Sequence, residues 1–594
     1  MLQKKYDLIN EIDVTKMPYE RRFNLLNSKF KELFFPTLLA AIAGNFAILA
    51  DAFIISALLG PMNLSVIQSI EPLVQFINMV YWLIGFGGTI LATSEKANFN
   101  EKKANYIFTI SLVSIIIISV LIMILGLLFP DSFLQILCNS SELRPLVYEY
   151  LKFYLLAIPF ICFFIVLAYF AKIDDFVQLQ FRAFLVANVL NVIFDIVFIY
   201  YFNMGISGAA LGMVFGYLIA TVYLCTYFFN PKRTLKLIKI EFKKSIQYLV
   251  DICKTGYSSS SIALYQAIKL AIINFIILGV MANVGLVAFN MCCNTSLLVS
   301  IFIFGTAQAL LPIVTVYFQE KDYNGVEYVA RRSLKIVIGF GIFFTALFTI
   351  FPQTILSIFS VSNPSDIPVV MNAVRIFSLS LLAYSINFLY IFYVQSIQNI
   401  KLANILTLLN GLIFPVAFVF VFSIIWGENG TWFAFVVSEI ATLIVIYIYS
   451  KYLNKKTNGE YSGFFLKKHH DENEKMLEYT IHANKNDAVY LSKQVHGFLP
   501  DEKTSILVSL AIEELLIYIL DINDKLYWID VIVRDNAEST IISIKHSGIG
   551  YNPKTDTDLN SDNINMLLSV SDNIDYSQIL GLNNTVITIK KNNG

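Results

Sequence analysis

The sequence is short of charge, and histidine is missing from its first 468 residues. Charged residues make up 14% of the chain and hydrophobic residues 57%, whereas about a quarter of an average soluble chain is charged. This balance indicates that most of the chain is surrounded by lipid rather than water. Since all five histidines follow residue 468, any proton-binding site in the apolar part of the chain has to use carboxylates.

Cysteine, nucleotide-binding and charge patterns argue against several further classes. The six cysteines stand in apolar segments and form no CxxC pair, which favours buried thiols over disulfides or zinc. The sequence contains no Gly-x-x-x-x-Gly-Lys-Ser/Thr loop, so an ATP-driven pump is disfavoured. A net charge of zero argues against a nucleic-acid partner. The first apolar segment is too long for a cleaved secretory signal, so we expect the N-terminus to remain attached.

Apolar segments close to membrane-spanning length recur from residue 33 to residue 452. A helix needs roughly 20 apolar residues to cross the hydrocarbon core. The pattern predicts an all-α polytopic membrane protein followed by a small cytoplasmic α+β domain. The twelve expected helices lie near residues 33–58, 64–93, 106–129, 146–170, 180–202, 206–229, 255–281, 284–317, 334–352, 368–397, 401–424 and 430–452.

Lysine and arginine are distributed unevenly between the segments that connect these helices. One set of connections holds only Arg144, whereas the other set carries basic pairs. Such a bias places the basic segments in the cytoplasm. We therefore expect a multi-pass protein of the inner cell membrane with both termini cytoplasmic. The basic segments are 1–32, 94–105, 171–182, 230–254, 318–335 and the C-terminal region.

The membrane region repeats itself at an offset of about 220 residues. Leu59-Gly60 and Leu190-Asn191 recur 219 positions later, and Phe129-Pro130 and Gly205-x-x-Gly208 recur 222 positions later. Two parallel six-helix halves, related by an axis along the membrane normal, explain this near-constant offset. The expected parts are a cytoplasmic N-terminal segment (1–32), an N-lobe (33–229), a basic cytoplasmic linker (230–254) and a C-lobe (255–452).

From residue 453 the composition becomes polar. Residues 453–475 are expected to form a linker, and residues 476–594 a compact domain of ordinary size. Alternation of apolar and polar residues predicts strands, and amphipathic periodicity predicts helices. The expected order is a strand at 479–482, helices at 485–498 and 503–520, strands at 527–534 and 540–545, a helix near 561–569, and strands near 573–579 and 583–590.

Two carboxylates fall inside predicted N-lobe helices. Asp51 lies in the first helix and Asp195 in the fifth, where Asn191 precedes it by four residues on the same helix face. A charge inside the hydrocarbon costs roughly 2.5–3.5 kcal/mol on insertion. One interpretation is structural pairing that fixes the helix register, and the other is a site for Na⁺ or H⁺. The C-lobe has no carboxylate at the repeated positions, Leu270 and Phe414, which favours an ion site in one lobe alone.

Three more ionisable residues are candidates for a cavity or substrate site. Glu71 precedes Pro72 in the second helix, Glu439 lies in the twelfth and Lys269 in the seventh. Pro72 can kink its helix and expose the carboxylate, while either acid can also lie at an aqueous rim. Lys269 either offsets an acid or extends toward the membrane surface. Phe and Tyr are abundant, and some of them can line a pocket for organic cations.

The membrane region resembles the multidrug and toxic compound extrusion (MATE) family. The resemblance is carried by the Asp51 helix, by Asn191-x-x-x-Asp195 and above all by Met204-Gly-Ile-Ser-Gly-Ala-Ala-Leu211. It implies twelve helices in two lobes around a central cavity, which expels cationic or amphipathic compounds in exchange for Na⁺ or H⁺. It also implies that Asp51, Asn191 and Asp195 bind the coupling cation.

Two departures from the family pattern qualify this resemblance. The loop Lys172-Ile-Asp-Asp175 stands where an Asp-Gly turn is common. The acids that another branch of the family carries in its C-lobe are missing, which favours cation coupling in the N-lobe. No cofactor is implied, and no metal other than Na⁺ at the three N-lobe residues.

The tail resembles the ATP-binding domain of histidine kinases and anti-sigma factors. Residues 511–518 match its N-box helix, and residues 545–553 match its adenine-side turn. However, Tyr518 replaces the Mg²⁺-binding Asn, and His546 replaces the Asp that reads adenine. The resemblance therefore implies a degenerate domain that is not expected to bind ATP, with a regulatory or protein-interaction role. The residues at its nucleotide-binding positions are Glu514, Gly548, Gly550 and Asn552.

The leading functional hypothesis is a cation-coupled antiporter, not an enzyme, that exports small cationic or amphipathic compounds. Its expected partners are the small-molecule substrate, the lipid bilayer and a cytoplasmic regulatory protein at the tail. A transporter-like sensor that signals through the tail belongs to a different class of function. A flippase for lipid-linked oligosaccharides ranks third, because its pyrophosphate needs cavity cations, and only Lys269, Arg182 and Arg375 could serve.

Overall fold

The computed structural model describes residues 21–591, with gaps at 60–61, 138–143, 240–241, 359–366, 459–460, 462, 467–474, 524–525, 527 and 554–561. The chain forms two compact units. The membrane unit comprises residues 30–468, and the tail unit combines residues 1–29 with residues 469–594. Each unit is described by itself.

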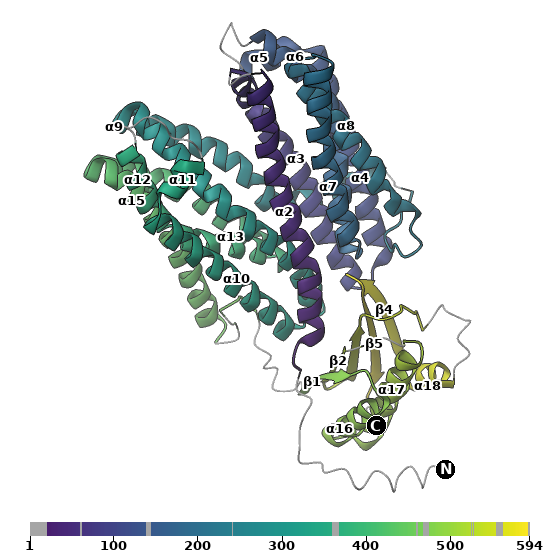
Figure 1. Ribbon diagram of the computed structural model, residues 1–594. Helices are drawn as coiled ribbons and strands as arrows, with labels where there is room; N and C mark the ends of the chain where they lie inside the picture. The colour runs from purple at the N-terminus through teal and green to yellow at the C-terminus, as the bar shows by residue number, and fades with distance from the viewer. Residues whose placement is uncertain are drawn as a thin grey trace. The chain divides into compact units, whose positions relative to one another are not determined.

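The first half of the membrane unit is helical throughout its length (Figure 1). Apolar residues dominate these helices on all sides, as expected for segments that contact both lipid and protein. The helices are α2 (Asn24–Leu59), α3 (Met62–Ala97), α4 (Glu101–Leu128), α5 (Pro130–Leu137), α6 (Arg144–Ile173), α7 (Val177–Ile196) with the π-helical turn η1 (Val197–Tyr201), and α8 (Ile206–Leu224) with the short 3₁₀ helix η2 (Cys225–Phe229).

The second half contains a matching series of helices. Its first helix begins earlier than predicted, within the basic linker, and α10 begins about ten residues earlier than predicted. The reason at α10 is an N-cap, because the Asp322 carboxylate accepts the Gly325 N–H at 2.9 Å. The helices are α9 (Phe242–Gln319), α10 (Tyr323–Ile350), α11 (Gln353–Ile358), α12 (Ile367–Ser378), α13 (Leu381–Ser396), α14 (Ile400–Leu408), η3 (Leu409–Ile413) and α15 (Phe414–Lys456).

The described residues contain nine helical segments long and apolar enough to cross a membrane, and the pair α12 and α13, bent by 48°, makes a tenth. One segment, Ile400–Lys456, has 57 residues, or about 85 Å of helix, far more than the ~30 Å hydrocarbon core. Gly427 breaks it at φ 57° and ψ −131°, which leaves enough residues for two spans. With α2, whose 36 residues are only partly described, the helices agree with the predicted twelve. The predicted fold class is confirmed.

The internal repeat is visible in the backbone. Helices α4 and α10 each contain 28 residues, and their C-caps, Phe129 and Phe351, stand directly before a proline. Three turns that require a positive φ occur in both halves, and the paired residues lie 222 or 223 positions apart. The pairs are Phe99 with Lys321, Asp175 with Gln398, and Gly205 with Gly427. The Leu278-Gly279 pair, by contrast, lies inside α9 rather than at a helix end.

Helices α3 and α9 cross at a pair of glycines. A Cβ atom at Gly87 of α3 would lie 2.0 Å from the carbonyl oxygen of Ile252. A Cβ atom at Gly256 of α9 would lie equally close, 2.0 Å, to the carbonyl oxygen of Leu83. The two backbones therefore touch without intervening side chains, which is the packing that small residues allow between membrane helices. The crossing joins the N-lobe to the C-lobe.

A buried lysine makes a second contact between the lobes. At the end of α6, the Lys172 ammonium donates to the backbone oxygen of Gln308 at 2.7 Å and to its Oε1 at 2.8 Å. Lys172 is 4% exposed, so these two acceptors of α9 replace water around its charge.

The Asp174 carboxylate holds the turn that follows α6. It accepts hydrogen bonds from Lys96 Nζ at 3.1 Å, Tyr227 Oη at 2.8 Å and the Thr234 N–H at 2.8 Å. The next residue, Asp175, has φ 70°, in the left-handed region where Gly is favoured and Asp is among the tolerated exceptions. The chain therefore keeps the turn even though Asp replaces the Gly of the family pattern.

The tail unit contains a β-sheet (Figure 1). Its five strands are antiparallel and lie in the order β1-β2-β3-β5-β4. One hydrophobic core joins its strands and helices. The two-residue turn between β4 and β5 is Leu580-Gly581, and both residues have positive φ, as a tight hairpin requires. The elements are β1 (Lys475–His482), α16 (Lys485–Phe498), α17 (Glu502–Asp521), β2 (Trp528–Asp535), β3 (Ser539–His546), α18 (Asp562–Val570), β4 (Asn573–Ile579) and β5 (Leu582–Lys590).

Substitution of either crossing glycine tests the contact between α3 and α9. Gly87→Ala and Gly256→Ala each place a methyl group against a backbone carbonyl, and overpacking of this kind costs about 1–3 kcal/mol. We expect both variants to lower the unfolding temperature of the purified protein in detergent. Gly339→Ala in α10 is the matched control, because nothing lies within 4 Å of its Cβ position. Equal unfolding temperatures in all three variants would show that the crossing is not tight.

Candidate functional site

The N-lobe carries a buried carboxylate paired with an amide. Asp195 in α7 is 0% exposed, and Asn191 lies one helical turn before it. Asn191 Nδ2 lies 3.1 Å from Asp195 Oδ1 and 3.1 Å from Oδ2, so the amide donates to the carboxylate as the i, i+4 spacing predicts. Asn191 and Asp195 are called the N-lobe pair below.

Glycines of α8 cover the N-lobe pair. A Cβ atom at Gly212 would lie 2.2 Å from Asp195 Oδ1, and one at Gly216 would lie 3.1 Å from the backbone nitrogen of Asn191. Helix α8 can therefore approach α7 this closely only because both positions lack a side chain. This close packing explains why Gly212 and Gly216 stand one turn apart, a signal that the sequence analysis missed.

Asp51 lies on α2, but its side chain is outside the described residues. Nothing in the structure therefore tests whether it joins the N-lobe pair. Residues of α2 and α7 line a cavity of about 390 Å³. Its lining combines a Lys and a Glu with apolar residues: Lys31, Glu32, Phe35, Pro36, Leu39, Gln178 and Phe181.

The C-lobe also carries a buried carboxylate held by amides. Glu439 of α15 is 9% exposed. Its Oε2 accepts from Asn387 Nδ2 of α13 at 2.7 Å and from Asn410 Nδ2 of η3 at 2.7 Å. Asn387 also donates to the backbone oxygen of Glu439 at 2.9 Å. Glu439, Asn387 and Asn410 are called the C-lobe cluster.

Two features of the C-lobe cluster indicate that it could bind a water or a ligand group. Asn387 is 0% exposed, and within the described residues its Oδ1 has no hydrogen-bond partner. Lys269 of α9 is half-buried and interacts electrostatically with Glu439. A carboxylate, an unused amide oxygen and an ammonium group thus meet in one region of the C-lobe, where a water or a ligand group could bind.

The two lobes use the repeated asparagine differently. Asn410 lies 219 positions after Asn191, and both donate to a carboxylate. In the N-lobe the carboxylate belongs to the same helix, whereas in the C-lobe it comes from α15. Phe414, which is not an acid, stands at the position that repeats Asp195, so the repeat in the sequence does not connect Asn410 with Glu439.

Glu71 stands apart from both groups. It is exposed in α3, and its Oε1 accepts from Gln75 Nε2 at 2.6 Å. Glu71 makes no contact with the N-lobe pair or the C-lobe cluster among the described residues, and its role in a cavity stays a prediction. No group of three or more His, Cys, Asp or Glu side chains in the described part of the chain could hold a metal ion.

The predicted nucleotide-binding positions of the tail form a tightly packed turn. Glu514 lies half-buried on α17, and Gly548, Gly550 and Asn552 follow β3. The backbone oxygen of Gly548 accepts from Asn583 Nδ2 at 2.8 Å, and a Cβ atom at Gly548 would lie 2.2 Å from Asn523 Oδ1. Packing therefore explains the two glycines, because a side chain at either position would collide with an Asn side chain that contacts the turn.

Tyr518 and His546 are buried where the resemblance would place nucleotide-binding groups. Both contact Tyr551, whose ring lies 4.8 Å from the Tyr518 ring and 6.4 Å from the His546 ring between centroids. His546 Nδ1 accepts the Gly548 N–H at 3.1 Å, so the proton of the neutral ring belongs on Nε2. Burial lowers the pKa of His546 from 6.5 to about 4, so the ring stays neutral at physiological pH.

An arginine before α2 belongs to the tail unit. Arg21 contacts Glu478 Oε2 of β1 at 3.3 Å and Asp530 Oδ2 of β2 at 3.4 Å. Asp530 is 0% exposed, and Thr480 also donates to it at 2.8 Å. The sequence analysis missed this ion pair because the partners lie more than 450 residues apart. Since α2 runs without a break from Asn24 to Leu59, Arg21 ties the tail sheet to the start of that helix.

The MatE family model matches residues 36–197 and 261–421, one segment in each half and more than half of the chain together. The chain belongs to the MatE family. It is therefore a secondary transporter rather than an enzyme, and a multi-pass membrane protein. The two matched segments lie entirely within the membrane unit.

Curated relatives and solved structures agree with this assignment. The multidrug export protein MepA of Staphylococcus saprophyticus is 21% identical over 62% of this chain and 81% of its own length. MepA of Staphylococcus haemolyticus is 22% identical over 63% and 82%. An outward-facing multidrug resistance MATE family transporter of the MOP superfamily shares the fold with a TM-score of 0.67 and 20% identity over 72% of this chain and 96% of its own. A MOP superfamily transporter from Pyrococcus furiosus has a TM-score of 0.65 at 20% identity over 71% and 95%.

The buried His546 predicts acid sensitivity of the tail. Its pKa lies at about 4 in the folded state against an ordinary 6.5, so the unfolded state binds the extra proton between these values. The neutral His546 ring therefore makes its full contribution to the free energy of unfolding of the tail above pH 6.5. This free energy falls by about 3 kcal/mol as the pH drops to 4. Urea unfolding of the tail in the full-length protein, followed by pulse proteolysis at each pH, measures this loss.

His546→Asn and His546→Gln should flatten that pH dependence, because neither side chain titrates. Ser547→Ala, at the exposed neighbouring position, is the matched control and should keep the wild-type slope. Parallel curves for wild type and both His546 variants would show that another group causes the acid sensitivity.

Proposed function

We propose that this MatE protein is an antiporter that exports small cationic or amphipathic compounds in exchange for Na⁺ or H⁺. The observation that carries the proposal is the N-lobe pair, a carboxylate with no exposed surface that accepts hydrogen bonds from an amide of the same helix. A carboxylate inside a membrane helix is costly, and residues of this kind mark ion pathways. The names of the MepA relatives, multidrug export proteins, support the substrate class.

Asp51 completes the proposed cation site. Two carboxylates and the Asn191 amide oxygen form a set of hard oxygen ligands that suits Na⁺, and either carboxylate can instead carry a proton. Helix α2 bears Asp51 and helix α7 bears the N-lobe pair, and residues of both helices line the cavity of about 390 Å³. Cation binding at Asp51, Asn191 and Asp195 would draw α2 toward α7, and release would let it move away, which couples the ion to the cavity.

The C-lobe cluster is the proposed contact for the cationic substrate. Glu439 and the unused Asn387 Oδ1 offer acceptors for an ammonium group, while Lys269 limits the net charge of the region. A neutral or doubly charged compound would fit these groups less well than a single cation. The proposed division of roles is therefore a coupling cation in the N-lobe and an organic cation near the C-lobe cluster.

Loss of the N-lobe carboxylates tests the proposal. Asp195→Asn and Asp51→Asn keep the side-chain size but remove the charge that binds the cation. Everted vesicles that carry the wild-type protein should accumulate an external fluorescent organic cation when a Na⁺ gradient or a pH gradient is imposed. Vesicles with either variant should accumulate no more than vesicles without the protein. Asp131→Asn, at a carboxylate that is 86% exposed in α5, is the matched control and should transport normally.

Normal transport by Asp195→Asn at normal protein level would overturn the coupling site. Absence of transport even with wild type, across several organic cations, would instead favour the sensor that signals through the tail. The flippase has less support, because Arg182 and Arg375 are exposed side chains and only Lys269 is partly buried.

The tail is proposed to regulate transport rather than to bind nucleotide. Tyr518 and His546 pack against Tyr551 in the core of the domain, which leaves them poorly suited to Mg²⁺ or adenine. Arg21, by contrast, links the sheet through Asp530 and Glu478 to the start of α2. Because α2 carries Asp51, a protein bound to the tail can influence the proposed cation site through one continuous helix.

Substitution of the Arg21 ion pair tests this regulation. Arg21→Gln and Asp530→Asn each break the buried ion pair between these two residues, and breaking a buried pair by removing one partner costs about 3–5 kcal/mol. We expect faster hydrogen exchange in β1 and β2 and a changed transport rate in both single variants, and little further change in the double variant. Lys485→Gln is the control, since its partner Asp521 is 52% exposed. Faster exchange with an unchanged transport rate would show that the tail does not act through α2.

A further inference from the structure

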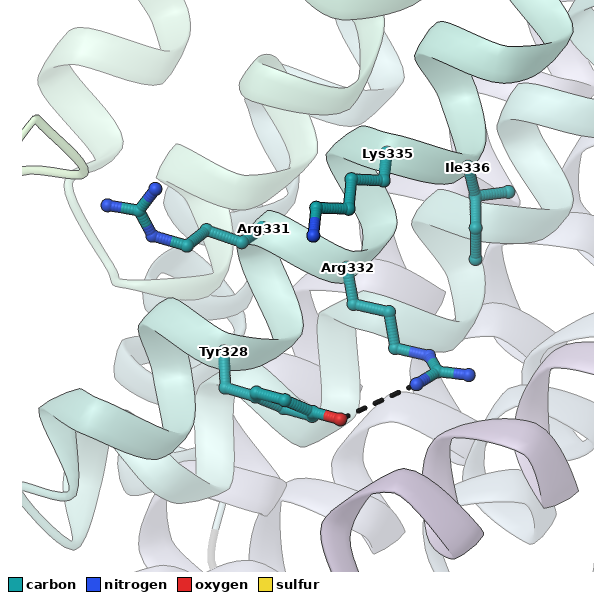
Figure 2. Close-up of a pocket in the computed structure, with 5 residues that line it drawn as sticks. All are labelled: Tyr328, Arg331, Arg332, Lys335 and Ile336. Carbon is teal, nitrogen blue, oxygen red and sulfur yellow. Dashed lines mark hydrogen bonds between the residues drawn. The ribbon is translucent and has the colours of Figure 1, made fainter. Parts of the chain in front are cut away.

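One face of α10 gathers three cationic side chains around a cavity. Tyr328, Arg331, Arg332, Lys335 and Ile336 line a space of about 450 Å³. Relative to Tyr328, the other four residues lie three, four, seven and eight positions later, so all five share one side of the helix. Figure 2 shows Arg332 pointing toward the Tyr328 hydroxyl, Arg331 pointing the other way, and Lys335 between them.

The three cations are only partly compensated. Arg331 pairs with Glu327, with its Nε and Nη2 at 2.8 and 2.5 Å from Oε1. Arg332 donates to the Tyr328 hydroxyl at 3.5 Å, while its buried Nε has no hydrogen-bond partner in the described part of the chain. Lys335 makes no ion pair with any residue that the structure describes. One carboxylate thus faces three cations, and a buried guanidinium donor is left over.

The exposed stripe of α10 changes from charged to apolar along its length. The stripe begins at Arg331 and Lys335, which are exposed. It continues along the same face with apolar side chains that are more than half exposed: Ile342, Phe343 and Ile350, at 54, 58 and 62%. Helix α10 is itself a membrane-length span. Cations above a row of exposed apolar side chains match the profile of one lipid molecule, with a phosphate at the head and acyl chains below it.

The basic group is not explained by the orientation of the helix alone. In the repeated helix α4, the basic residues Lys102 and Lys103 stand in the first turn and are exposed. Arg332 and Lys335 lie about two turns further into α10, roughly 14–18 Å from its start. The positions of α4 that match them at the offset of 222 are Ile110 and Val113. The cations of α10 are therefore an addition within the C-lobe that the repeated helix lacks. Glu327 and the rings of Phe464 and Phe30 meet part of the charge of Arg331 and Arg332, and a bound anion would meet the rest.

We propose that this face of α10 binds the phosphodiester headgroup of an anionic phospholipid from the cytoplasmic leaflet. The Arg332 guanidinium supplies a planar pair of donors that fits phosphate oxygens, and Lys335 and the Tyr328 hydroxyl supply further donors. Ile336 and the apolar stripe below it contact the glycerol and acyl chains. The net positive charge of the group selects a lipid with a net negative charge over a zwitterionic one.

Lipid binding to the purified, delipidated full-length protein tests the proposal. Native mass spectrometry in neutral detergent measures binding of phosphatidylglycerol, with phosphatidylcholine of the same acyl chains as the zwitterionic comparison. Loss of charged hydrogen bonds to the headgroup should weaken phosphatidylglycerol binding roughly tenfold in the Arg332→Gln/Lys335→Gln variant. The matched control is Lys102→Gln/Lys103→Gln, which removes two exposed cations of the repeated helix and should bind like wild type.

Three results would overturn the proposal. Equal phosphatidylglycerol binding by wild type and both double variants would exclude the α10 face as the site. Equal binding of phosphatidylcholine and phosphatidylglycerol by wild type would remove the selection for negative charge. Inorganic phosphate that stabilises wild type against heat as well as the lipid does, but not the α10 variant, would assign the site to a soluble phosphate. An unfolding temperature of the α10 variant equal to that of wild type, without lipid, confirms that it is folded.

Discussion

A polar group placed among membrane helices must find a partner inside the protein, and this constraint organises the membrane unit. Asp195 is held by an amide of its own helix, Glu439 by amides of two other helices, and Lys172 by two oxygens of Gln308. These hydrogen bonds replace the water that each polar group would contact outside the membrane.

The internal repeat provides the frame on which this chemistry is placed. Turns with positive φ recur in both halves, as do the proline that follows α4 and α10 and the glycine that precedes the last helix of each half. Side chains that carry charge do not recur. The two halves therefore share their backbone breaks but differ in the charged side chains placed on them.

Most of the fold could be predicted from the sequence, because it depends on local patterns. Span length, the positive-inside bias and strand alternation each need only one stretch of chain, and the tail elements agree with the prediction to within a few residues. The N-lobe pair was predictable for the same reason, since four residues separate its members. The C-lobe cluster was not, because Asn387, Asn410 and Glu439 come from three helices and no local signal connects them. The ion pair between Arg21 and Asp530 spans 509 positions, which no periodicity can reveal.

The crossing of α3 and α9 has a mechanical consequence. At Gly87 and Gly256 the two backbones touch directly, and Lys172 of α6 also holds Gln308 of α9. A contact between bare backbones cannot be compressed, and a buried ammonium group cannot be pulled from its acceptors without a large cost. The crossing is therefore a natural pivot between the lobes. Because helix ends far from a pivot move most, a rotation of a few degrees there would move them by several ångströms.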